Sequence, residues 1–110
     1  MLLSDKRIVE ELKSGNLVIE PFDERQLGTN SYDCRLGEWY YQGDANVEVM
    51  HLDNPDEIRT YWGQPRQAKQ GKIAIRPGTT ILAHTLEVIG GRNGYLGKMY
   101  SRSTVARSGL

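Results

Sequence analysis

The sequence predicts a mainly β protein with a short helix at its N-terminal end, and three observations lead to this prediction. After residue 16 the chain consists largely of short apolar runs broken by Gly, Pro and Asn, a spacing typical of strands and turns. β-branched residues are frequent in the run 79–89, as strands favour. Near the N-terminus, by contrast, apolar residues recur at helical spacing.

The first element is expected between Ser4 and Gly15. Ser4 is a good helix N-cap, because its hydroxyl oxygen can accept a hydrogen bond from an amide of the first turn. Ile8, Val9 and Leu12 then fall on one face of a helix. Gly15 supplies the stop, since glycine readily adopts the left-handed conformation that ends many helices.

Strands are expected next, at residues 17–19, 35–41 and 47–52, because each of these apolar runs is followed by Pro, Gly or Asn-Pro. Residues 43–71 are interpreted as a polar insertion or hairpin. Within it, residues 53–71 are polar, carry two prolines and two glycines, and predict a long loop or a hairpin insertion.

The last third of the chain predicts two more β segments and a helix. Residues 72–76 and 79–89 are expected as strands, separated by the turn Pro77-Gly78. A second short helix is expected to start near Ser103.

Length and composition indicate one domain with a modest core, since the chain has 110 residues, 38% of them apolar and 25% charged. No run approaches the ~20 apolar residues of a membrane span, and no basic leader precedes an apolar stretch. We therefore expect a cytoplasmic protein without a membrane partner. Cys34 is the single cysteine, which excludes an internal disulfide and a cysteine-based zinc site. We expect its thiol to be buried and inert.

Charge is divided unevenly along the chain. Residues 1–60 hold 13 Asp and Glu against 6 Lys and Arg, whereas residues 61–110 hold 1 against 8. Either the two halves neutralise one another, within the fold or between subunits, or the basic half faces a polyanion. An extended basic patch with interleaved aromatic residues is absent, so we expect a compact anion and no nucleic acid as partner.

The stretch YSRSTVARSGL, residues 100–110, has the chemistry of a phosphate site. If a helix begins after Arg102, the amides of its first turn favour an anion, and Ser103 and Thr104 add hydroxyl donors. Arg107 lies four residues after Ser103, so both point the same way. Together with Arg102 these groups match a di- or triphosphate. The alternative is an ordinary turn with solvated arginines, since so short a pattern is not specific.

Three stretches resemble dCTP deaminases: LSDKRIVEELKSGNLVIEPFDERQLGTNSYDCRLG, RPGTTILAHTLEVI and SRSTVARSGL. They occur in the family's order and cover most of the chain outside residues 43–71. The resemblance implies the distorted β-barrel or jelly-roll fold shared with dUTPases. It further implies a single domain over residues 1–110, a homotrimer with active sites between subunits, and Mg²⁺ carried by the nucleotide triphosphate.

The resemblance also assigns roles to individual residues. The implied nucleotide-phosphate contacts are Arg102, Ser103, Thr104, Val105, Ala106 and Arg107. The segment that holds Asn30, Ser31, Asp33 and Arg35 is interpreted as structural, through turns and ion pairs. His84 and Glu87 are three residues apart on an expected strand and therefore point to opposite faces, so we expect no zinc site.

The family's mechanism has implications for this chain. The resemblance implies a metal-free reaction in which a glutamate activates water to attack C4 of dCTP, giving dUTP and ammonia. In the family that glutamate lies downstream of the phosphate motif, so we expect the domain to be truncated at its C-terminal side. No catalytic residue is assigned here, and we expect the 110-residue chain alone to be inactive.

Two alternatives stay open. One is a dUTP diphosphatase, or a bifunctional deaminase and diphosphatase, of the same fold. The other is a non-catalytic nucleotide-binding or regulatory fragment. The helical opening and the S-Y-D-x-R-L-G run favour the deaminase, because the family's plain dUTPases generally lack them.

Overall fold

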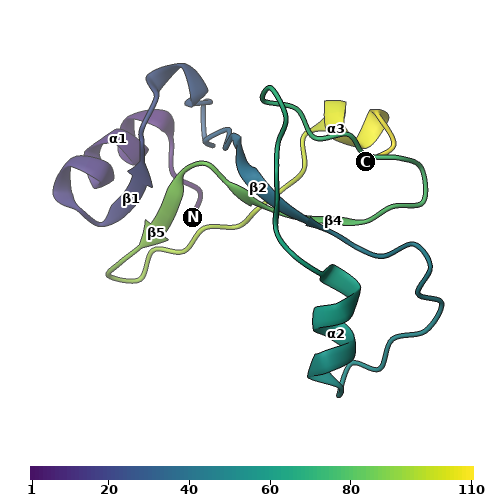
Figure 1. Cartoon of the computed structure of the whole chain (residues 1–110). Helices are drawn as coiled ribbons and strands as arrows, with labels where there is room; N and C mark the ends of the chain where they lie inside the picture. Colours follow the sequence, from purple (N-terminus) through teal and green to yellow (C-terminus); the bar gives the residue numbers. More distant parts are fainter. The chain divides into compact units, whose positions relative to one another are not determined.

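The chain divides into two units, and the computed structural model describes every residue, 1–110 (Figure 1). Unit 1 comprises residues 1–33 and 88–110, and unit 2 comprises residues 34–87. Helices and strands each account for 24% of the residues. The composition is therefore mixed, with more helix than the expected mainly β protein.

Unit 1 opens with helix α1, Asp5–Ser14, as the sequence predicts. The Ser4 Oγ accepts a hydrogen bond from the Arg7 amide at 3.3 Å, which caps the first turn. The helix ends at Gly15, whose φ of 79° is left-handed. The Gly15 amide donates hydrogen bonds to the carbonyls of Glu11 and Leu12 in the last turn. Ile8 is buried on the inner face of this helix.

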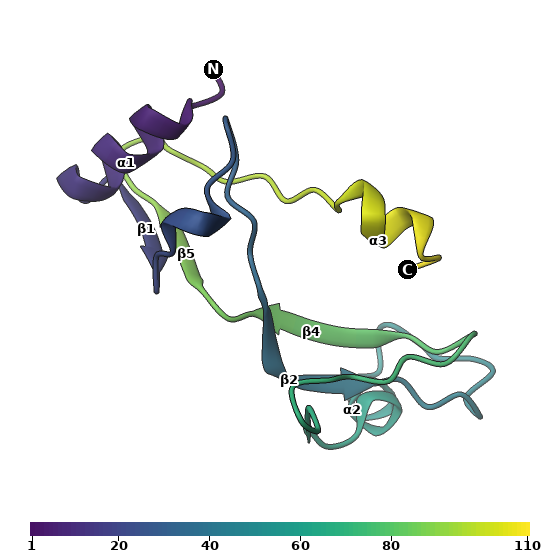
Figure 2. The ribbon, with the colours of Figure 1, turned by 90° about the horizontal axis from the view of Figure 1, so that it is seen from above.

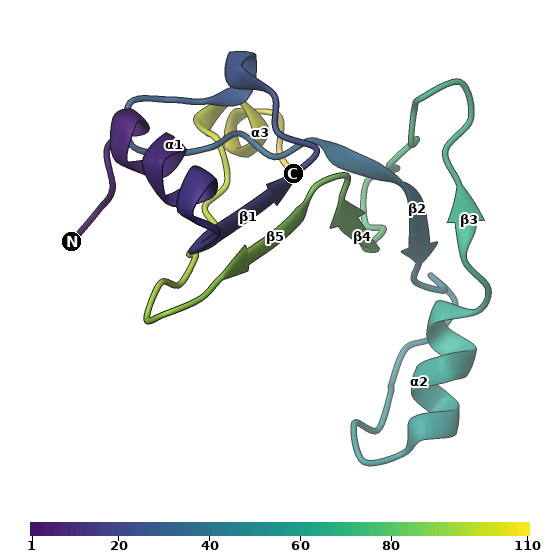
Figure 3. The same cartoon turned by 90° about the vertical axis from the view of Figure 1, so that its left-hand side faces the viewer.

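A two-stranded antiparallel sheet follows helix α1 in unit 1. Strand β1, Leu17–Glu20, pairs with β5, Val88–Gly91, with Ile19 opposite Ile89 (Figure 3). The expected strand at 17–19 is thus confirmed. A short 3-10 helix, η1, Glu24–Gln26, comes after β1.

One buried carboxylate, that of Glu11, joins helix α1 to residues that follow it in unit 1. The Glu11 carboxylate accepts hydrogen bonds from the Asn16 amide group at 2.6 Å and from the Ser14 hydroxyl at 3.2 Å, and pairs with Arg7 at 2.6 Å. Its side chain is only 6% exposed. The hydrogen bond from Asn16, with further ones from Tyr95 and Ser14, holds the pKa of Glu11 below its ordinary value.

Unit 2 is built on a three-stranded antiparallel sheet. Strand β2, Leu36–Gln42, lies between β3, Arg66–Gln67, and β4, Ile81–Thr85 (Figure 3). Figure 2 shows β4 beside β2 from above. The register of β2 against β4 shifts between Leu36 and Tyr40. Neither this sheet nor the pair in unit 1 closes into a barrel.

The stretch predicted as a long loop contains a helix. Helix α2, Pro55–Trp62, lies within residues 53–71, so the loop prediction is wrong there. The Asn54 side chain caps its first turn by accepting from the Asp56 and Glu57 amides, and Pro55 occupies the first helical position. The sequence prediction gave more weight to the two prolines and the low apolar content of residues 53–71, which favour a loop, than to these helix signals.

Three other expectations are corrected. Residues 47–52 form no strand, because no neighbouring strand pairs with them. Of residues 72–76, only Lys72 makes a β-bridge, to Lys69. Cys34 is exposed rather than buried, since it lies outside the strands, before β2 begins.

The apolar core is small. Ile8 is the one buried apolar residue. Large apolar residues such as Leu96, Met99 and Leu82 are more than half exposed. None of the three α-helices is long and apolar enough to cross a membrane.

Candidate phosphate-binding site

The arginine-rich stretch in unit 1 folds into helix α3, Ser103–Arg107. Arg102 precedes it with extended backbone, φ −75° and ψ 149°, so the chain turns from an extended segment into a helix at this residue. This is the change of backbone that the sequence predicts. The Arg102 carbonyl accepts the first helical hydrogen bond, from the Ala106 amide at 3.1 Å.

Helix α3 presents hydrogen-bond donors that nothing in the chain uses. The backbone amides of Ser103, Thr104 and Val105 have no acceptor within the protein, as in the first turn of any helix that lacks a side-chain cap. The Ser103 and Thr104 hydroxyls also make no hydrogen bond in the chain. Amides and hydroxyls together offer several donors to an oxyanion.

Arg107 is on the same side of helix α3 as Ser103, because four residues separate them. Its guanidinium has no ion-pair partner in the structure, and the whole helix is exposed to solvent. Five residues give little helix polarity, so the charge that would hold an anion comes mainly from Arg107 and Arg102.

Arg102 is held by an acidic residue from the early part of the chain. Its Nη1 lies 3.5 Å from Oδ2 of Asp33, with side chains 68% and 42% exposed. The interpretation of Asp33 as an ion-pair residue is confirmed. The sequence did not indicate that its partner would be an arginine of the candidate site, 69 positions away.

Arg35 forms an ion pair of a different kind, inside unit 2. Its Nε donates to Oε1 of Glu87 at 2.7 Å, and its backbone amide donates to Oε2 at 2.9 Å. The Glu87 side chain is fully buried. Burial alone would raise the pKa of Glu87, but the hydrogen bonds from Arg35 outweigh it and hold this pKa below its ordinary value.

His84 and Glu87 do not come together as a pair of ligands. The His84 Nδ1 donates to the Thr85 carbonyl at 2.8 Å, and the imidazole packs directly over Gly37, where any larger side chain would collide with the ring. Glu87 is engaged with Arg35 instead.

Ser31 lies in a turn, as the sequence predicts. The Ser31 carbonyl accepts a hydrogen bond from the Gly28 amide at 2.8 Å.

Comparison with known proteins finds a matching family and several relatives of the chain. The family model described as dCTP deaminase-like matches residues 2–110. A protein of Ignicoccus hospitalis named dCTP deaminase is 32% identical over 110 residues, which cover 100% of this chain and 61% of that protein. One of Acidothermus cellulolyticus named "dCTP deaminase, dUMP-forming" is 33% identical over 110 residues, 100% of this chain and 57% of that protein.

A third relative, named dCTP deaminase, comes from Haloarcula marismortui and is 30% identical over 97% of this chain and 56% of its own length. The chain thus spans little more than half the length of the curated relatives it matches. The matched residues include α1, the segment that holds Asp33, and α3. The chain therefore belongs to the dCTP deaminase-like family.

Proposed function

We propose that this chain binds the triphosphate of dCTP through residues 102–107 and serves an enzyme that deaminates dCTP to dUTP and ammonia. The observation that carries the proposal is helix α3, with its unpaired amides, its two hydroxyls and the unpartnered Arg107, in a member of this family. Magnesium enters with the nucleotide as part of the substrate. A homotrimer and a closed barrel or jelly roll, both implied by the resemblance, belong to the same proposal.

The chemical step needs a group that takes a proton from water within hydrogen-bond reach of C4. Glu87, the one acidic residue after position 60, is unsuited to this task, because its carboxylate is buried and already accepts two hydrogen bonds from Arg35. We therefore assign residues 102–107 to binding and no residue of the chain to catalysis.

A bifunctional enzyme is the second candidate. Several relatives carry the name "dCTP deaminase, dUMP-forming", among them those from Acidothermus cellulolyticus and Rhodococcus opacus. Such an enzyme would also cleave the triphosphate. Chromatography of the nucleotide products separates the two candidates, since one yields dUTP and the other dUMP.

The binding proposal is tested by Arg107→Ala. Loss of a charged hydrogen-bond partner should weaken dCTP binding by about 1.5 to 3 kcal/mol. Isothermal calorimetry with Mg²⁺ and dCTP measures it. Arg92→Ala is the matched control, because Arg92 is also an exposed arginine of unit 1 without an ion-pair partner, and its substitution should leave affinity unchanged. Equal affinity of Arg107→Ala and the unaltered chain would mean that α3 is an ordinary solvated turn.

A further inference from the structure

Unit 2 contains a cavity at the C-terminal end of helix α2. Its volume is about 520 Å³, and it is formed by residues at the end of β2, the last turn of α2 and the turn that leads into β3. Pro65 has no amide hydrogen to continue the helix, and the Asp44 amide donates instead to the Tyr61 carbonyl at 3.0 Å. Gly43 is buried under the Tyr61 ring, where a methyl group would collide with the Tyr61 hydroxyl. The cavity therefore belongs to the fold of unit 2, and its volume is typical of small-molecule sites.

Hydrogen-bond acceptors and negative charge line one part of this cavity. The Thr60 and Trp62 carbonyls, at the end of α2, accept no hydrogen bond in the chain. Such terminal carbonyls carry partial negative charge. Asp44 adds a full charge: its Oδ1 accepts from the Asn46 amide at 2.9 Å, while its Oδ2 accepts no hydrogen bond in the chain. Together these groups favour a cation.

Two aromatic side chains also line the cavity. Tyr61 and Trp62 pack edge to face, with their ring centroids 4.8 Å apart. Both residues are half-buried. Because the face of an aromatic ring attracts a positive charge, they add to the preference for a cation.

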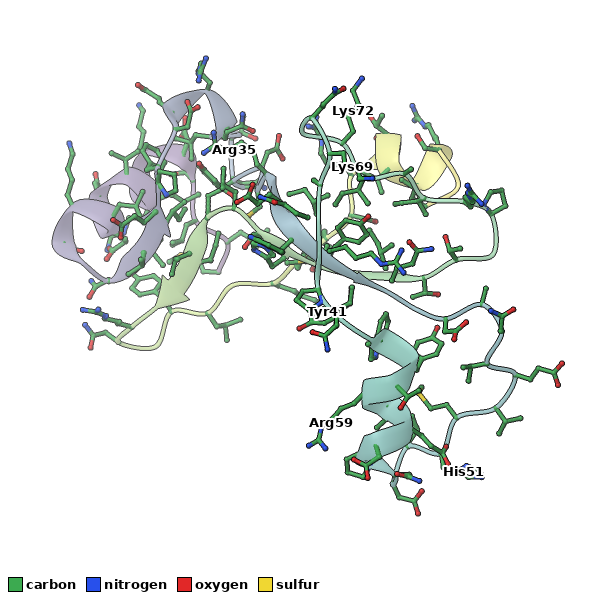
Figure 4. All side chains as sticks on the ribbon, viewed as in Figure 1. Arg35, Tyr41, His51, Arg59, Lys69 and Lys72 are labelled. Carbon is green, nitrogen blue, oxygen red and sulfur yellow. The ribbon has the colours of Figure 1, made fainter.

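Arg66 brings the opposite charge to the same cavity. Its Nη1 donates to the side-chain oxygen of Gln42 at 2.9 Å, and its guanidinium forms no ion pair, not even with Asp44. The remaining N–H groups of Arg66 suit the two oxygens of a carboxylate. No other charged residue lines the cavity, and His51 lies at the opposite end of α2 (Figure 4). The cavity thus presents two opposite charges that do not neutralise each other directly.

We propose that this cavity binds a free α-amino acid with a cationic side chain. The carboxylate of the amino acid pairs with Arg66, and its cationic groups face Asp44, the carbonyls at the end of α2 and the aromatic rings. A nucleotide would bind poorly, because one arginine would meet several phosphate charges beside the carboxylate of Asp44. The inference does not rest on the nucleotide site at residues 102–107.

Tryptophan fluorescence can report on the cavity, because the chain has only two tryptophans, Trp39 and Trp62. In a Trp39→Phe protein, the remaining indole lines the cavity, and L-arginine should change its emission saturably. Agmatine lacks only the carboxylate, and N-acetyl-L-arginine has no α-ammonium charge. Each should bind at least about tenfold more weakly than L-arginine, because each loses one charged hydrogen-bonding group. Isothermal calorimetry on the unaltered chain should give the same order of affinities.

Two substitutions separate the contributions of the opposite charges. Asp44→Asn removes the negative charge but keeps the oxygen that accepts from Asn46, and it should weaken binding of both L-arginine and agmatine at least about tenfold. Arg66→Gln should weaken L-arginine by the same factor and leave agmatine unchanged, which also shows that the variant is folded. Arg76→Gln is the matched control, because Arg76 is an exposed arginine of unit 2 outside the cavity, and it should bind both compounds normally.

Three results would overturn the proposal. The first is a failure of L-arginine to bind the unaltered chain. The second is equal affinity of L-arginine and agmatine, because the carboxylate would then have no partner. The third is normal binding of L-arginine by Asp44→Asn and Arg66→Gln, since neither charge of the cavity would then contact the ligand.

Discussion

Glu87 shows how a single side chain is fixed by its surroundings. A carboxylate in a buried site is costly unless it is hydrogen-bonded and paired, and Arg35 meets both conditions through its backbone amide and its Nε. The Glu87 backbone carbonyl also accepts from the Thr85 hydroxyl at 2.7 Å. The geometry thus makes Glu87 a structural residue of unit 2.

Replacing Glu87 by Ala should therefore destabilise the protein. The substitution leaves the donors of Arg35 without their acceptors, and the loss of hydrogen bonds to a charged group costs about 1.5 to 3 kcal/mol. Urea unfolding followed by circular dichroism measures the free energy of unfolding. Glu48→Ala serves as control, because Glu48 is exposed and makes no hydrogen bond. Equal unfolding midpoints for the two variants would contradict the structural role.

At the scale of elements, the C-terminal end of α1 permits a clean test. Gly15 has a left-handed φ of 79°, and a methyl group added there would contact nothing within 4 Å. Gly15→Ala should thus cost only the backbone strain, about 1 to 2 kcal/mol of unfolding free energy. Gly97→Ala is the matched control, because a methyl group at Gly97 would also meet open space but Gly97 has no left-handed φ. This substitution should leave the free energy of unfolding unchanged. Thermal unfolding of both variants decides whether the backbone conformation matters.

Helix α1 could be predicted because its signals are local: the capping Ser4, the spaced apolar residues and Gly15 all agree. Helix α2 carries local signals as well, but two prolines and a polar composition outweighed them. Strands depend on partners that the sequence does not reveal. Residues 47–52 have strand-like composition yet no strand beside them, and residues 72–76 pair only at Lys72.

The candidate site was predictable to the same extent. The change from extended chain to helix at Arg102 follows from residues adjacent in sequence, and the structure has it. The ion pair between Arg102 and Asp33 joins residues from the two separate stretches of the chain that make up unit 1. It could not be predicted from the spacing of residues in the sequence.

For the whole molecule, three carboxylates should set the response to acid. The folded-state pKa is lowered at Glu11 mainly by Asn16, at Glu57 mainly by the His51 amide, and at Glu87, despite burial, by Arg35. An unfolded glutamate titrates near pH ~4.3. These carboxylates therefore contribute stability that is fully present above that pH and is lost as the pH falls through their lower folded values.

Urea unfolding at a series of pH values measures this dependence. The free energy of unfolding should change little through these groups between pH ~7 and ~5 and then decline below ~4.3. Glu11→Gln should flatten the acid side of the profile, because the neutral amide cannot take up a proton there. A profile with the same acid slope in both proteins would show that Glu11 does not contribute.

The ion pair between Arg35 and Glu87 also bears on the order in which the protein folds. Strands β1 and β5 pair Glu20 with Val88, and these two residues are 68 positions apart in the sequence. Once Arg35 and Glu87 meet, the path between these strands shortens to 16 positions, and the entropy cost of closing the loop falls by about 1.3 kcal/mol. Unit 2 should then close first and guide the two separated parts of unit 1 together. Glu87→Ala would slow refolding as well as speed unfolding, which stopped-flow kinetics can distinguish.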